Sequence, residues 1–152
     1  MATIITRTRI IFLNVFLLLS APLLAATDSP VGLWKNIDDV TGQAKALIEI
    51  SANAGVLEGR IVQLFRQSDE EQNPLCAKCT GTLHEQPVLG MTILTGLKKD
   101  GDEWDDGAIL DPNNGKVYRC KIALVDGGTK LEVRGFIGIS LFGRSQVWER
   151  QP

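Results

Sequence analysis

The sequence predicts an all-β protein, and more specifically an eight-stranded antiparallel up-and-down barrel. Apolar and polar residues alternate with a period of two along eight short runs, which is the pattern of half-buried strands. Short turns rich in Gly, Asn and Asp join most of these runs, so consecutive strands can pair as antiparallel neighbours. Pairing of the first strand with the last leaves no open sheet edge. A two-sheet sandwich is the alternative arrangement.

The hairpin around residues 104–124 shows the strand pattern most clearly. In its turn, Asp111–Gly115, Pro112 fixes one φ angle, and Asn114 and Gly115 accept the positive φ values that close a hairpin. After the turn, one face of the strand carries the side chains of Tyr118, Cys120, Ile122 and Leu124. By the same reasoning, the expected strands are residues 31–37, 43–51, 56–65, 91–98, 103–110, 116–125, 130–137 and 144–150.

One long connection interrupts this plan between the third and fourth expected strands. Residues 66–90 are polar, contain Asn73-Pro74 and the only histidine, and show no strand period. A connection of this length is too long for a hairpin turn. We therefore expect one long loop in a barrel otherwise joined by short connections.

The first 26 residues have the three parts of a secretory signal peptide. Arg7 and Arg9 give a basic start, residues 10–19 form an apolar core, and Ala25 and Ala26 are small residues at a cleavage position. We expect residues 1–26 to be the signal peptide and residues 27–152 to be one β-barrel domain, periplasmic or secreted. An uncleaved membrane anchor is the alternative. No later run is long and apolar enough to span a bilayer, so no stable membrane span is expected after cleavage.

The charge balance limits the classes of partner. The chain has 16 Lys and Arg against 18 Asp and Glu, a net charge of −2. Loss of the two signal-peptide arginines makes the remaining domain more acidic. An acidic domain without basic clusters argues against nucleic acid or an anionic membrane surface as partner. The sequence does not indicate an oligomeric state.

Several motifs along the chain resemble the DUF2147 family of exported bacterial proteins. The motifs are Gly32-x-Trp34, Gly59-x-Ile61, Asn73-Pro74, Pro87-x-x-Gly90, Ile109-x-Asp111-Pro112-x-x-Gly115-Lys116-x-Tyr118, Val133-Arg134-Gly135-Phe136-x-Gly138 and Gly143-Arg144-Ser145-Gln146-x-Trp148-x-Arg150. The resemblance implies a small lipocalin-like β-barrel. It implies no catalytic residues, because the family has no established activity.

Trp34 is expected to close one end of the barrel. Gly32-x-Trp34 resembles the lipocalin signature, in which an arginine from late in the chain covers a tryptophan on the first strand. Trp148 and Arg150 share a face of the last expected strand, which lies beside the first in a closed barrel. A guanidinium of Arg150 over the indole of Trp34 is therefore predicted, with Arg144 as the alternative arginine.

The three cysteines allow more than one interpretation. Cys76 and Cys79 lie three residues apart in the long polar loop, and an oxidising compartment favours a disulfide between them. Zinc binding with His84 and Cys120, or a thioredoxin-like redox site, are the alternatives. Cys120 alternates with apolar residues and is expected to stay a buried thiol. We expect no metal site and no cofactor.

The function predicted from the sequence is binding of a small, largely apolar molecule inside the barrel. An eight-stranded barrel has an interior that either holds one ligand or is filled by side chains. The expected ligand-binding residues are Ala46, Ile48, Ile61, Tyr118, Ile122 and Leu131. The alternative is a filled barrel acting as an envelope protein-interaction or stress-protection module. An enzyme is not expected, because no catalytic constellation is visible: one histidine and no G-x-S-x-G elbow leave a hydrolytic triad without a base.

Overall fold

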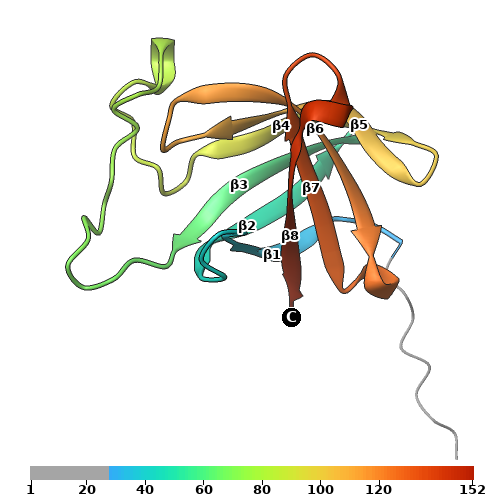
Figure 1. Ribbon diagram of the computed structural model, residues 1–152, viewed down its shortest axis with the longest axis horizontal. Helices are drawn as coiled ribbons and strands as arrows, with labels where there is room; N and C mark the ends of the chain where they lie inside the picture. Colours follow the sequence, from blue (N-terminus) through green and yellow to red (C-terminus); the bar gives the residue numbers. More distant parts are fainter. Residues whose placement is uncertain (1–27) are drawn as a thin grey trace, which may run out of the picture.

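The computed structural model describes residues 28–152, and the expected signal peptide lies outside these described residues. The chain forms a closed barrel of eight antiparallel strands in sequence order (Figure 1). The strands are β1 (Gly32–Ile37), β2 (Ala44–Asn53), β3 (Val56–Leu64), β4 (Thr92–Asp100), β5 (Glu103–Asp111), β6 (Lys116–Val125), β7 (Lys130–Phe136) and β8 (Arg144–Gln151). The all-β up-and-down barrel predicted from the sequence is confirmed, and the sandwich alternative is wrong.

Closure depends on the pairing of β1 with β8. Trp34 is opposite Arg150 in this antiparallel pair, and Lys35 is opposite Glu149. The strands begin and end within about two residues of their expected bounds, because turn residues mark nearly every boundary. The β4–β5 connection is shorter than expected. It consists of Gly101 and Asp102 alone, since Gly101 has a φ of 57° and supports a two-residue turn.

The connections divide between the two ends of the barrel. One end, here called the closed end, carries the start of β1 and the β2–β3, β4–β5 and β6–β7 turns. The opposite end, here called the open end, carries the β1–β2 turn, residues 65–91, the β5–β6 turn and the β7–β8 loop. Residues 65–91 are the expected long loop, drawn mostly in green along one side of Figure 1. Three short 3₁₀ turns lie in the connections: η1 (Gly81–Leu83), η2 (Asp126–Gly128) and η3 (Ser140–Phe142).

The half of the barrel next to the closed end is packed with large apolar side chains. They are Trp34, Ile50, Leu57, Leu94, Leu97, Trp104, Ile122 and Leu131, and all are buried. Two glycines admit the leucines of β4. A Cβ at Gly59 would lie 2.9 Å from Leu94 Cδ1, and one at Gly107 would collide with the Leu97 side chain. Gly59 therefore leaves no open space in the interior, because Leu94 occupies it.

No helix among residues 28–152 has the length and apolar character needed to cross a bilayer.

Candidate functional site: a cavity at the open end

The closed end is sealed by Trp34 and Arg150. The Arg150 guanidinium carbon lies 4.2 Å from the centre of the Trp34 ring, in a cation–π arrangement. The guanidinium also donates to three backbone carbonyls, those of Gly128 at 2.7 Å, Ser29 at 2.7 Å and Val31 at 3.2 Å. The Trp34 indole N–H donates to the carbonyl of Pro30 at 2.7 Å. Burial lowers the pKa of Arg150 from its ordinary value.

The other half of the barrel is hollow. A cavity of about 830 Å³ reaches from the open end into the interior. Its inner walls are mainly apolar side chains of Ala46, Ile48, Ile61, Ile93, Val133 and Trp148, and its rim carries charged side chains of Asp38, Lys45, Arg66, Glu70, Lys78, Asp111 and Arg144. Both signs of charge are present around the rim. The cavity therefore combines an apolar interior with a polar opening, which is the usual composition of a small-molecule pocket.

The residues expected to bind a ligand divide between the two halves. Ala46, Ile48, Ile61 and Tyr118 line the cavity. Ile122 and Leu131 are buried but lie outside the cavity lining, in the packed half. Alternation along a strand predicts which face points inward, but the depth of a residue along the barrel axis depends on the assembled barrel.

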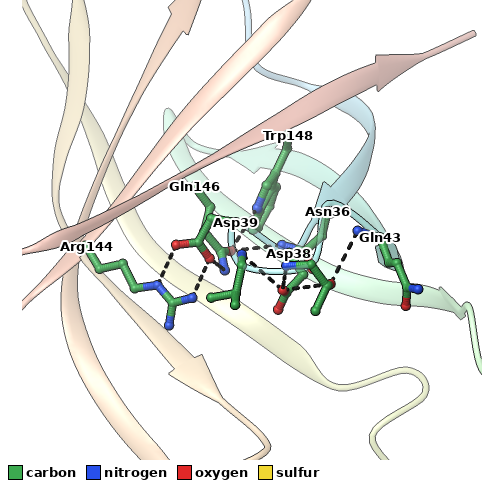
Figure 2. Close-up of polar contacts among 9 residues, drawn as sticks. Asn36, Asp38, Asp39, Gln43, Arg144, Gln146 and Trp148 are labelled. Atoms are coloured by element: carbon green, nitrogen blue, oxygen red, sulfur yellow. Dashed lines mark hydrogen bonds and ion pairs between the residues drawn. The ribbon is translucent and has the colours of Figure 1, made fainter.

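A polar network at the rim joins β8 to the β1–β2 turn (Figure 2). Arg144 Nε donates to Asp39 Oδ2 at 2.7 Å, and a second nitrogen of the same guanidinium donates to Oδ1. Gln146 donates to Asp39 at 3.3 Å, and it accepts from Asn36 at 2.9 Å and from the Trp148 indole N–H at 3.3 Å. The Arg144 hydrogen bond holds the pKa of Asp39 below its ordinary value. This network fixes the orientation of Trp148 in the cavity wall.

Arg144, the alternative arginine, does not cover Trp34. It is at the start of β8 and contacts Asp39 at the open end, whereas Arg150 at the other end of the strand covers Trp34. The β8 residues Arg144, Gln146, Trp148 and Arg150 are spaced by two, so one strand supplies both the rim and the closed end.

Tyr118 contributes the one phenol of the chain to the cavity lining. Asn114 donates to the Tyr118 hydroxyl at 3.1 Å and to Asp111 Oδ2 at 2.8 Å. The β5–β6 turn therefore holds the Tyr118 hydroxyl in place through Asn114. Tyr118 thus adds a polar group to a lining that also contains the polar side chains of Asn36 and Gln146.

The 65–91 loop is fastened across one side of the open end. Its Cys76 and Cys79 sulfur atoms are at disulfide distance, and both side chains are buried. The Cys76 sulfur contacts the Pro112 carbonyl at 3.4 Å, and a Cβ at Gly115 would collide with the Lys78 carbonyl. Residues 76–79, here called the disulfide segment, thus pack tightly on the β5–β6 turn.

The remaining thiol and the histidine lie apart from this disulfide. Cys120 is buried among the strands, and burial raises its pKa to about 12. His84 is exposed at its side chain and contacts the Cys79 carbonyl at 3.1 Å. Among residues 28–152, no three His, Cys, Asp or Glu side chains are grouped so that they could hold a metal ion.

Three features of the site could not be predicted from the sequence. The Asp39–Arg144 pair joins a turn to a distant strand, and nothing in the local pattern of either residue indicates the partner. The three carbonyl acceptors of Arg150 belong to backbone whose position is set by closure. The path of the 65–91 loop depends on contacts with Gly115, which the sequence showed only as a turn residue.

A closed eight-stranded up-and-down barrel, with one sealed end and one hollow half, defines a lipocalin-like β-barrel protein. The chain belongs to the DUF2147 family, described as "uncharacterized protein conserved in bacteria", which matches residues 32–150.

Among solved structures, the fold is similar to that of protein HP1028 from the human pathogen Helicobacter pylori, which is described as belonging to the lipocalin family. The TM-score is 0.69 with 16% sequence identity, and the match covers 83% of this chain and 85% of HP1028. At this identity the likeness concerns the fold. A search of the curated proteins found no match.

Proposed function

We propose that the protein is an exported, non-enzymatic carrier that binds a small, largely apolar molecule in the hollow half of the barrel. The cavity of about 830 Å³ with its apolar inner walls is the observation that supports this function. Pockets for small molecules range from about 300 to 1,000 Å³ and bury most of the ligand surface. The lipocalin-like fold supports the same class of function.

A cavity-filling substitution tests whether the interior is the binding site. The probe is N-phenyl-1-naphthylamine, a small apolar molecule whose fluorescence rises on transfer from water to an apolar site. Ala46 lies in the cavity wall, so Ala46→Phe is expected to weaken probe binding by about tenfold or more. Ala52→Phe is the matched control, because Ala52 is an exposed residue of the same strand outside the cavity lining. Thermal unfolding of both variants checks that each is folded.

The same titration separates the proposed function from its alternative. Equal weakening by both substitutions, or no saturable binding to the unsubstituted protein, would favour an interaction or stress-protection module with no internal ligand. Native mass spectrometry of protein purified from its own host complements the titration. A copurified small molecule that is absent from the Ala46→Phe variant is the expected result.

Export is tested separately from binding. The basic start and apolar run of residues 1–26 support removal of this segment in the periplasm or during secretion. Intact mass of the protein recovered from the cell envelope is expected to place the N-terminus at or close to residue 27. A mature chain beginning at Met1 would contradict the localisation and leave the binding proposal unaffected.

A further inference from the structure

The β7–β8 loop exposes more large apolar side chains than any other short segment of residues 28–152. Ile137, Ile139, Leu141 and Phe142 are 70%, 60%, 75% and 79% exposed. The last two belong to the 3₁₀ turn η3, which lies where the red loop at the top of Figure 1 returns to β8. Clustered exposed apolar residues on a soluble domain mark a site of interaction with a protein or a membrane.

Four backbone carbonyls of this loop already accept hydrogen bonds from the protein. Arg119 donates to the Gly138 carbonyl at 3.2 Å, and Arg134 donates to the Ser140 carbonyl at 2.7 Å and to that of Leu141 at 3.2 Å. The amide of Phe142 donates to the Ile139 carbonyl. Four consecutive carbonyls therefore need no water, which lowers the cost of moving the loop into an apolar environment.

The same two arginines bring positive charge next to the apolar side chains of the loop. Neither Arg119 nor Arg134 forms an ion pair with a carboxylate among residues 28–152. The segment 133–148 contains no Asp or Glu, and the flanking Glu132 is joined to Arg134 only through Ser145, which accepts from Arg134 at 2.9 Å and donates to Glu132 at 2.8 Å. A guanidinium is complementary to a phosphate oxygen, and exposed apolar side chains beside two guanidinium groups match the neighbouring acyl chains and phosphates of a phospholipid interface.

We propose that the β7–β8 loop inserts into the interface of a phospholipid bilayer. A loop of seven residues is narrow compared with the roughly 800 Å² that each partner contributes to a standard protein–protein interface. A bilayer interface accepts a few apolar side chains from a narrow tip. The net charge of the chain gives no attraction to an anionic surface, so the contact relies on apolar insertion and on local guanidinium–phosphate pairing.

Insertion would bring the cavity opening to the membrane surface. Gly135, Arg144 and Gln146 line the cavity and directly flank the loop. Two more strongly exposed apolar side chains lie at the same end of the barrel, those of Val40 and Val117. The membrane contact does not depend on the cavity holding a ligand.

A tryptophan placed in the loop reports insertion locally. The three native tryptophans are buried, so a fourth one dominates any change caused by lipid. The full chain carrying Phe142→Trp is mixed with phosphatidylcholine vesicles, and then with vesicles whose acyl chains are brominated. A blue-shifted emission and quenching by bromine are expected. Val147→Trp, on the outer side of β8 away from the loop, is the matched control and is expected to show neither change. All variants carry the same N-terminus, verified by intact mass.

The amount of bound protein gives a second measurement. In vesicle sedimentation, the double substitution Leu141→Ser and Phe142→Ser is expected to lower the vesicle partition coefficient that depends on the loop by about tenfold or more. The same decrease is expected at high salt, because apolar insertion is not screened. Circular dichroism checks the fold of each variant.

Three results would overturn the proposal. The first is an unchanged emission of folded Phe142→Trp with vesicles. The second is an equal response of Val147→Trp. The third is a blue shift that follows protein concentration without lipid, because it would assign the loop to contacts between copies of this chain.

Discussion

The two ends of the barrel use arginine and tryptophan from the same strand pair in different ways. At the closed end, Arg150 stacks on Trp34 and donates to three backbone carbonyls. These contacts hold its side chain over the end of the barrel. At the open end, Arg144 pairs with Asp39 at the rim and leaves Trp148 in the wall of a hollow space. The difference shows how one barrel combines a stable half with an accessible half.

Substitution of the two most contrasting aromatic residues gives the largest expected difference between the ends. Trp34→Ala removes a fully buried ring from the packed half and is expected to lower the free energy of unfolding by about 4 kcal/mol. Phe142→Ala at the open end is expected to change it by less than about 0.5 kcal/mol, because that ring is exposed. Denaturant unfolding measures both. Similar losses for the two variants would remove the distinction between a stabilising end and an accessible one.

The two arginines of β8 give the next largest difference. Arg150→Ala is expected to cost about 2 kcal/mol of unfolding free energy, since it loses the ring contact and three carbonyl partners. Arg144→Ala removes a solvent-exposed ion pair and is expected to cost less than about 1 kcal/mol. A double-mutant cycle with Trp34→Phe isolates the ring contact. Additive effects of Trp34→Phe and Arg150→Ala would contradict the proposed role of the contact.

A substitution in the β5–β6 turn is expected to loosen the open end without unfolding the barrel. Gly115→Ala would collide with the Lys78 carbonyl and displace the disulfide segment. The Cys76 amide donates to the Gln86 carbonyl, and the Glu85 amide donates to the Cys76 carbonyl. Hydrogen exchange of both amides is expected to accelerate by about tenfold. Gly127→Ala is the matched control, because Gly127 has a similar positive φ but nothing within 4 Å of its added Cβ. Equal acceleration by both would mean that backbone strain, not the contact, governs the exchange.

The smallest expected effect is the pH dependence of the Asp39–Arg144 pair. Because the folded pKa of Asp39 lies below its ordinary value of 3.8, the pair stabilises the fold above that value. This stabilisation is lost as the pH falls through the lower folded pKa. The deficit of Asp39→Asn relative to the unsubstituted protein is therefore expected to shrink from below about 1 kcal/mol near neutral pH towards zero in acid. Glu58→Gln, which changes an exposed strand carboxylate, is the control. A deficit that stays constant with pH would mean that Asp39 acts only as a hydrogen-bonding side chain.

The sequence predicted the barrel well because its strands and turns are specified locally. Alternation defines the inward face of each strand, and residues such as Pro112 and Gly115 end one strand and begin the next. The Trp34–Arg150 contact was expected from the resemblance of Gly32-x-Trp34 to the lipocalin signature, and closure makes it possible because the first and last strands pair. The division into two halves did not follow. It depends on Gly59 and Gly107 admitting Leu94 and Leu97, which only the assembled interior reveals.

The hollow half, and not the packed half, is proposed to hold an apolar molecule. Titration of N-phenyl-1-naphthylamine into methyl-labelled protein, followed by nuclear magnetic resonance, tests it most directly. The methyl groups of Ile48, Ile61 and Ile93 are expected to shift and saturate together, while those of Ile122 and Leu131 stay unchanged. Shifts confined to the exposed Ile137 and Ile139, or equal shifts in both halves, would contradict the account.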